Sequence, residues 1–236
     1  MAEHGGVTRA LVSLAGGVAD DRELARQICQ ACVTGLDVDG AALSLLTGSP
    51  SRVTLWASDA TAELLEDLQF TLNEGACMEA AATGSPVLVP DLAHAVEVAH
   101  WPIFAAAVAE RTPVRALFAL PLQWGAVNLG VVDLYRLRPG GLSDAERRDA
   151  LAAADTAAVL MLALRTDPGG DGWLDPAVGN RAEIHQATGM VLAQLGVSAQ
   201  EALARMRAYA FAEQRLLADV AQDVVARRLR FTEDMR

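Results

Sequence analysis

A run of turn-forming residues at 167–176 divides this 236-residue chain into two parts. The run reads Asp167-Pro-Gly-Gly-Asp-Gly-Trp-Leu-Asp-Pro176, with two prolines and three glycines. Proline lacks the backbone N–H that a helix needs and glycine is a poor helix former, so no helix continues through it. We therefore expect a larger domain at 1–166, a linker at 167–176 and a smaller domain at 177–236.

The distribution of charge follows the same division. Residues 1–174 carry 22 acidic side chains against 11 arginines, whereas residues 175–236 carry 8 of each, so the net charge of −11 lies in the first part. Such a charge argues against a molecule-wide basic surface for duplex nucleic acid. All 19 basic residues are arginine, and the lack of lysine excludes P-loop phosphate binding and Schiff-base catalysis.

Nothing in the sequence indicates export or a membrane span. The stretch 1–14 has no basic start followed by an apolar run, which is the pattern of a secretory signal. The apolar run 150–164 contains Asp155 and is shorter than the about 20 residues that cross a bilayer. Three cysteines cannot all pair, which suits a reducing compartment. We expect a cytoplasmic protein that does not contact membranes.

Hydrophobic spacing predicts an α+β first domain. Near-continuous apolar character at 114–122 and 127–135 indicates a hairpin at the centre of a sheet. Further strands are expected at 40–46, 51–57 and 86–89, and helices at 7–33 in two segments, 61–68, 75–83 and 143–165. The last helix starts with the capping box Ser143-Asp-Ala-Glu146. Its repeated Leu151, Ala154, Ala158 and Leu162 predict a dimer seam.

The second domain reads as three amphipathic helices within 178–229. Gly196 ends the first helix, and Ser198-Ala-Gln-Glu201 is a second capping box at the start of the next. Between residues 200 and 230 six arginines face four acidic residues. Arginine forks suit phosphate groups and stack on RNA bases, whereas the same charges also occur on solvated helix faces with ion pairs.

Few residues are candidates for chemistry. Cys29 and Cys32 have the C-x-x-C spacing, but no second pair completes a zinc site, so we expect both to pack as small hydrophobes. Cys77 enters a short helix whose dipole lowers a thiol pKa, so sensing is the alternative to packing. Asp133 lies in an apolar strand and needs an arginine or backbone donors as partner. The four histidines lack metal-binding spacing, so no metal site is predicted.

The first domain resembles a GAF sensor domain of the actinobacterial type. The resemblance covers residues 1 to about 166 and rests on five segments: Glu74-Gly-Ala-Cys77, Pro86-Val-Leu-Val-Pro-Asp-Leu92, Trp101-Pro-Ile-Phe104, Ala116-Leu-Phe-Ala-Leu-Pro-Leu122 and Gly130-Val-Val-Asp-Leu-Tyr135. It implies a central antiparallel sheet flanked by helices, with a pocket for a small-molecule signal. Trp56, Phe118 and Tyr135 fit either the core or the pocket lining, and no motif identifies the ligand or a cofactor.

The second domain resembles an ANTAR domain, the RNA-binding module of antitermination regulators. The matching pattern is Arg181-Ala-Glu-Ile184-His-Gln-Ala187-Thr-Gly189, Glu201-Ala202, Met206-Arg207, Ala210 and Leu217-Ala-Asp-Val-Ala221. The resemblance implies a three-helix bundle that binds RNA hairpin loops through Arg181, Arg205, Arg207, Gln214 and Arg215. Thr188 stands where the family often has lysine, so one expected phosphate contact is missing.

Together the resemblances imply a non-enzymatic regulator. Its ANTAR domain would bind paired RNA hairpins in leader transcripts as a homodimer, under control of the GAF domain. Two other functions stay open. One is a GAF-fold thiol enzyme, similar to a methionine sulfoxide reductase, that uses Cys77 with Cys29 or Cys32. The other is a dimeric interaction module that does not bind RNA.

Overall fold

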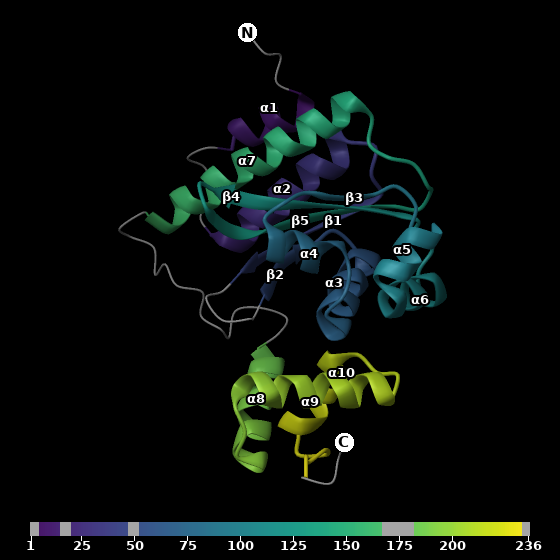
Figure 1. Cartoon of the computed structure of the whole chain (residues 1–236). Helices are drawn as coiled ribbons and strands as arrows, with labels where there is room; N and C mark the ends of the chain where they lie inside the picture. Colours follow the sequence, from purple (N-terminus) through teal and green to yellow (C-terminus); the bar gives the residue numbers. More distant parts are fainter. Residues whose placement is uncertain (1–4, 15–19, 47–51, 167–181, 233–236) are drawn as a thin grey trace.

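The computed structural model describes residues 5–14, 20–46, 52–166 and 182–232. Within these residues the first domain contains a five-stranded antiparallel sheet, in the order β2-β1-β5-β4-β3 (Figure 1). The strands are β1 (Gly40–Leu46), β2 (Arg52–Ala57), β3 (Val87–Val89), β4 (Ala116–Trp124) and β5 (Val127–Arg136). The predicted α+β fold is confirmed, and β4 and β5 form the predicted hairpin.

Helices cover both faces of the sheet (Figure 1). One face carries α1 (Gly6–Val12), α2 (Asp21–Gly35) and α7 (Asp144–Thr166); the other carries α3 (Ala60–Leu72), α4 (Ala76–Thr83), α5 (Ala95–His100) and α6 (Pro102–Arg111). The two faces hold separate hydrophobic cores. Helices α5 and α6 have no counterpart among the elements predicted from spacing. We call residues 5–166 the sheet unit.

Helix α1 is tied to α7 by a buried carboxylate. Asp149 accepts hydrogen bonds from the backbone N–H groups of Val7 and Thr8 at 3.0 and 3.1 Å and from the Thr8 hydroxyl at 2.7 Å. A buried charge needs such donors, because it loses its hydration on folding. The first turn of α1 supplies them, so the N-terminal helix and α7 depend on each other.

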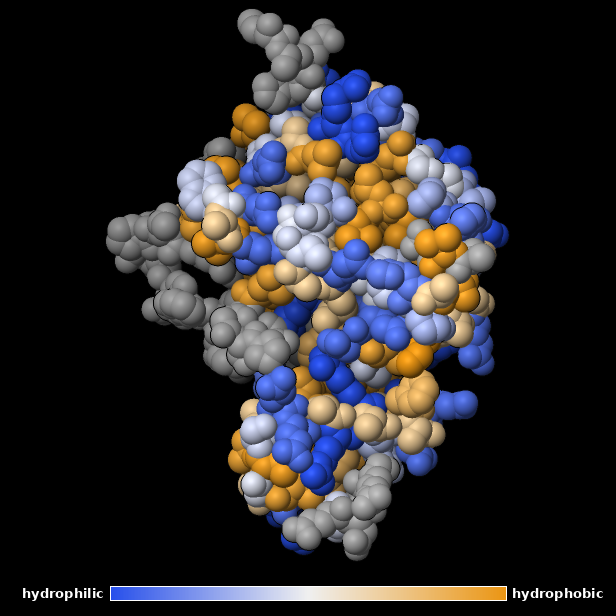
Figure 2. Space-filling view, viewed as in Figure 1, coloured by the Kyte–Doolittle hydropathy of each residue, from blue (hydrophilic) through white to orange (hydrophobic). Residues whose placement is uncertain are grey.

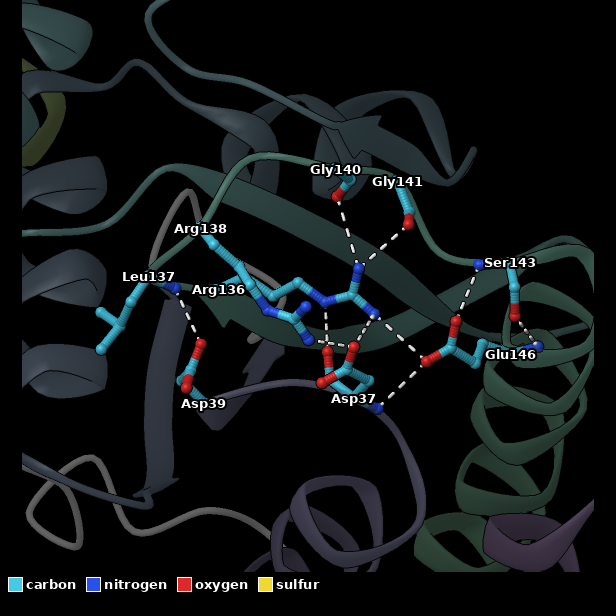
Figure 3. A network of polar contacts seen from close by, with 9 residues as sticks. All are labelled: Asp37, Asp39, Arg136, Leu137, Arg138, Gly140, Gly141, Ser143 and Glu146. Carbon is cyan, nitrogen blue, oxygen red and sulfur yellow. Dashed lines mark hydrogen bonds and ion pairs between the residues drawn. The ribbon is translucent and has the colours of Figure 1, made fainter.

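A second polar network fixes the start of α7 to the C-terminal end of β5 (Figure 3). The buried Arg136 guanidinium donates to the carbonyls of Asp37 and Gly141 and to the Glu146 carboxylate. The Ser143 hydroxyl accepts from the Glu146 N–H at 3.3 Å, and the Glu146 carboxylate accepts from the Ser143 N–H at 2.8 Å. This confirms the predicted capping box. These hydrogen bonds lower the pKa of Glu146, with that to Ser143 as the main cause.

Three helices form the C-terminal part, as predicted: α8 (Ala182–Leu195), α9 (Ala199–Ala212) and α10 (Leu217–Val225). We call residues 182–232 the helical unit. Their buried apolar side chains pack into one core, which includes Ile184, Val191, Met206, Leu217 and Val224. The Ser198 hydroxyl accepts from the Glu201 N–H at 3.2 Å, so this residue caps α9 as expected. The linker predicted at 167–176 lies outside the described residues.

The dimer seam predicted on α7 needs correction. Ala154 and Ala158 are buried in the core of the sheet unit, where α7 packs on β4. Small residues at helical spacing allow a helix to approach either a sheet or a second helix closely, and here they pack against the sheet. The half-buried Leu151 also packs against this core, Leu162 is half-buried, and Val159 is exposed. None of the described helices is long and apolar enough to cross a membrane.

Candidate nucleic-acid interface

The side chain of Arg207 lies at the junction between the two units. It extends from α9 onto the ring of Phe70 in α3, with its guanidinium carbon 4.9 Å from the ring centre. Burial lowers the pKa of Arg207, and within the described residues its Nε has no hydrogen-bond partner. An arginine fork that is partly desolvated and incompletely paired gains hydrogen bonds when it leaves the Phe70 ring for a partner such as phosphate.

The other two predicted arginines that the structure describes, Arg205 and Arg215, have acidic partners in the helical unit. Arg205 pairs with Glu201 one turn earlier at 2.8 Å. Arg215 pairs with Asp223 at 2.6 Å, and Asp223 also holds Arg228 at 2.7 Å. The Arg228 and Arg205 side chains are 61% and 35% exposed, so the Arg205 and Arg228 pairs are surface contacts of small strength. A phosphate competes for such arginines at little cost.

The structure does not bring all predicted contact residues to one place. Arg205 and Arg207 are two residues apart on α9, so they point to different sides of the helix. Arg207, Gln214 and Arg215 belong to the side of the helical unit that faces the sheet unit, and Gln214 takes a left-handed turn at φ 52° after α9. Arg181 lies outside the described residues.

Thr188 offers no charge at the position where lysine was expected. Its hydroxyl donates to the carbonyl of Ile184 in its own helix at 2.7 Å. The side chain is half-buried, and its oxygen lies 3.9 Å from the Met206 sulfur in α9. It therefore stabilises the contact between α8 and α9, in keeping with the missing phosphate contact inferred from the sequence.

The junction has polar and apolar contacts that hydrophobic spacing did not reveal. The Leu217 N–H at the start of α10 donates to the buried Thr71 hydroxyl of α3 at 3.2 Å. Phe70 belongs to α3 of the sheet unit, but its side chain is part of the core of the helical unit. Hydrophilic and hydrophobic side chains lie next to one another where the units meet (Figure 2). Helix α3 thus covers part of the face that carries Arg207.

A second candidate site is a buried polar cluster inside the sheet unit. Oxygen and sulfur atoms of Glu66, Cys77 and Asp133 lie within 4.8 Å of one another. Arg52 of β2 pairs with Glu66 at 3.2 Å and also contacts the Cys77 sulfur. Its guanidinium supplies the positive charge that a metal ion would bring, so this set favours an internal ion-pair cluster over a metal centre.

The partner that Asp133 was expected to need is an amide. Gln69 donates to the Asp133 carboxyl group at 2.8 Å, and the Gln69 oxygen accepts from the Cys77 N–H at 2.8 Å. Burial raises the pKa of Asp133 well above its usual range, and the charge of Glu66 raises it further. The environment therefore favours the neutral acid more strongly than water does.

The cysteines are not arranged as the thiol-enzyme alternative requires. Cys29 and Cys32 belong to the core on one face of the sheet, and Cys77 belongs to the core on the other face. All three are free and buried, and burial raises their pKa values. The alternative prediction of a reactive Cys77 with a lowered pKa is therefore wrong, because the desolvation of its thiol outweighs any helix-dipole effect. Packing, the expected role of Cys29 and Cys32, is confirmed.

The raised pKa of Asp133 predicts how stability depends on pH. Between the ordinary value of 3.8 and the raised value, the unfolded chain ionises while the folded protein keeps its proton, so stability falls as pH rises. Asp133→Asn replaces the acid by a neutral side chain. Between pH 5 and pH 8 we expect this variant to lose about 1 kcal/mol less unfolding free energy than the wild type, or to differ from it by more. Urea unfolding at the two pH values measures it.

The control for that experiment is Asp91→Asn. Asp91 pairs with Arg115, which lowers its pKa, so its contribution is present above 3.8 and is lost only at lower pH. This variant should therefore leave the change between pH 5 and pH 8 as it is in the wild type. If Asp133→Asn also leaves it unchanged, Asp133 is ionised in the folded protein.

Comparisons with known proteins agree with both units. A family model described as GAF domain matches residues 18–161, and one described as ANTAR domain matches residues 174–225. A search of curated proteins found no match.

Solved structures show the same fold for the sheet unit. The GAF domain of a phosphoenolpyruvate-protein phosphotransferase from Coxiella burnetii is 13% identical, with a TM-score of 0.54, and the similarity covers 67% of this chain and 92% of that one. The corresponding domain from Acinetobacter is 12% identical, with a TM-score of 0.50, and covers 70% and 95%. Since the GAF model matches more than half of the sequence, the chain belongs to the GAF domain family and carries an ANTAR domain after its GAF domain.

Proposed function

We propose that this protein is a transcription antitermination regulator whose ANTAR domain binds paired RNA hairpins in leader transcripts. The observation that carries the proposal is the ANTAR match over 174–225, because an ANTAR domain implies RNA-binding antitermination. We assign the sensor role to residues 1–166, as a GAF domain of the actinobacterial type, and the RNA-binding role to residues 177–236, joined by the linker at 167–176. This combination of domains is that of a regulatory protein, acting where transcripts are made, in the cytoplasm.

The charges of the helical unit support this role. RNA recognition uses arginines on phosphates and on unstacked loop bases. Arg205 and Arg215 bind acidic side chains that a phosphate displaces, and Arg207 lies on an aromatic ring, as it would on a base. We propose these three together with Arg181 and Gln214 as the RNA contacts. Three of them, Arg207, Gln214 and Arg215, lie on the side that faces the sheet unit.

We also propose that the protein acts as a homodimer, because paired hairpins present two equivalent sites. The outer face of α7, with the exposed Val159, does not pack on the sheet, and we propose it as the dimer contact. A dimeric module that does not bind RNA would use the same face, and RNA binding separates the two functions.

The proposal predicts salt-sensitive RNA binding by the full chain. The RNA is a two-hairpin leader from the host's own transcripts, and the affinity is measured at two salt concentrations. The logarithm of the affinity should fall with that of the salt concentration by about 0.7 for each phosphate contact on single-stranded loops. Arg205→Ala should weaken binding and reduce this slope by about 0.7, because it removes one phosphate contact.

Arg147→Ala is the matched control for Arg205→Ala. Arg147 is also an exposed helical arginine with an acidic partner, Asp144 at 3.4 Å, but it lies on α7 of the sheet unit. Its replacement should leave affinity and slope unchanged. Equal losses in both variants would mean that binding is non-specific, and no binding by the wild-type chain to any leader RNA would favour the interaction module.

A further inference from the structure

A cavity of about 580 Å³ lies between the two units. Helices α3 and α6 form one wall, and the end of α9 with the following turn forms the other. Its apolar lining includes Leu68, Leu72, Ile103, Ala107, Phe211 and Leu216. A volume of this size is typical of sites for small molecules, which are often found where two domains meet.

Two features distinguish this cavity from a packing gap. Ile103 and Phe211 are large apolar side chains with 39% and 55% exposure, and they line the cavity from different units. Exposed apolar side chains that converge on one hollow mark a binding site more often than a solvated surface. The contacts beside it, Thr71 to Leu217 and Phe70 to Arg207, hold the walls together without filling the space.

The charged groups at the cavity favour an anionic ligand. The charged residues of its lining are Arg111, Arg215 and Glu110. The Arg215 side chain is engaged by Asp223, whereas within the described part of the chain the Arg111 side chain forms no hydrogen bond or ion pair. A guanidinium beside an apolar wall suits a carboxylate on a hydrophobic body. The Gln214 amide adds a polar group on the opposite side.

Other cavities of the described residues fit a signal less well. A cavity beside Glu66 and Asp133 in the sheet unit has a volume of only about 10 Å³, which is room for about one water molecule. A cavity of about 490 Å³ between α5, α6 and the start of β4 is lined by the sheet unit alone. A ligand there would touch no residue of the helical unit.

We propose that the cavity between the units binds a small organic anion with an aromatic or branched apolar body, and that this ligand controls RNA binding. A ligand that contacts both walls stabilises the arrangement in which Arg207 lies on Phe70, by an amount that grows with its concentration. RNA needs Arg207 free, so the ligand lowers RNA affinity. The control of RNA binding rests on the proposed function, whereas the binding site itself does not.

The binding site is tested on the full chain with two fluorescent probes. The aromatic anion 8-anilinonaphthalene-1-sulfonate should bind, and the neutral N-phenyl-1-naphthylamine should bind more weakly. Ala107→Phe fills the cavity from α6 and should weaken binding of the anion about tenfold or more. Phe211→Ser removes an exposed wall residue, which the fold does not need, and should weaken it as well. Arg111→Gln should weaken the anion and leave the neutral probe unchanged.

Ala109→Phe is the matched control. Ala109 lies on the same helix but lines the other cavity, so this variant should bind the anionic probe like the wild type. Loss of probe binding in Ala109→Phe alone would place the site in the other cavity and overturn the proposal. Equal probe fluorescence in all variants would mean non-specific binding and would also overturn it.

The control of RNA binding is measured separately. Saturating anionic probe should weaken RNA binding by the wild type about tenfold and should have no effect in Ala107→Phe. Probe binding with unchanged RNA affinity would keep the site and overturn its regulatory role. If no RNA binds under any condition, the proposed function fails, and the probe titrations still decide whether the site exists.

Discussion

Replacing Arg207 by alanine is expected to weaken RNA binding by the full chain about 10- to 100-fold. An arginine that binds phosphate or stacks on a base contributes about 1.5–3 kcal/mol. The same side chain lies on Phe70 in this structure, so Phe70→Ala should have the opposite effect and raise RNA affinity. Fluorescence anisotropy with labelled leader RNA measures both variants under identical salt conditions.

The double variant Phe70→Ala/Arg207→Ala tests whether Phe70→Ala raises RNA affinity by uncovering Arg207. With Arg207 absent, Phe70 no longer masks this RNA contact, so Phe70→Ala should not restore RNA binding to Arg207→Ala. Unchanged affinity and salt slope in Arg207→Ala would show that this arginine is not an RNA contact. Unchanged affinity in Phe70→Ala would show that α3 does not compete with RNA for the helical unit.

Replacing Arg52 by methionine is expected to lower the free energy of unfolding by about 3–5 kcal/mol. Arg52 is buried, and it is the basic partner of Glu66 in the polar cluster. Methionine fills a similar volume but leaves the Glu66 carboxylate without this ion pair in a desolvated site. Urea unfolding followed by circular dichroism at neutral pH measures the loss.

Arg22→Met is the matched control for Arg52→Met. Arg22 is exposed and lies over the Trp56 ring at 5.9 Å, so its replacement should cost less than about 1 kcal/mol. Replacing Glu66 together with Arg52 by apolar residues should recover most of the lost stability, because no unpaired buried charge remains. A small loss in Arg52→Met, similar to that in Arg22→Met, would mean that Glu66 is neutral in the folded protein.

Spacing in the sequence predicted the elements whose pattern is local. The alternation of turn residues and apolar runs predicted the strands, and the Ser143 and Ser198 caps marked helix starts that the structure confirms. Helices α5 and α6 were missed because an alanine-rich stretch around Pro102 has neither a clear apolar period nor a cap with a polar side chain.

The interactions that form the polar cluster and the junction between the units are long-range, and sequence spacing does not report them. Arg52, Glu66 and Asp133 come from β2, α3 and β5, so only the sheet topology brings them together. The apolar period of α3 cannot show that Phe70 packs on the helical unit instead of its own domain. Likewise, Ala154 and Ala158 have a spacing that suits a dimer seam and a sheet contact equally well.

The bond between α1 and Asp149 sets the smallest part of the sensor domain that can be produced in isolation. The GAF model matches from residue 18, so a fragment cut at that point lacks both Val7 and Thr8. Their N–H groups and the Thr8 hydroxyl are donors to Asp149, and Val7 and Leu11 belong to the core under α7. Such a fragment exposes the apolar surface under α1 and removes these donors to Asp149, so expression boundaries for this domain belong before residue 5.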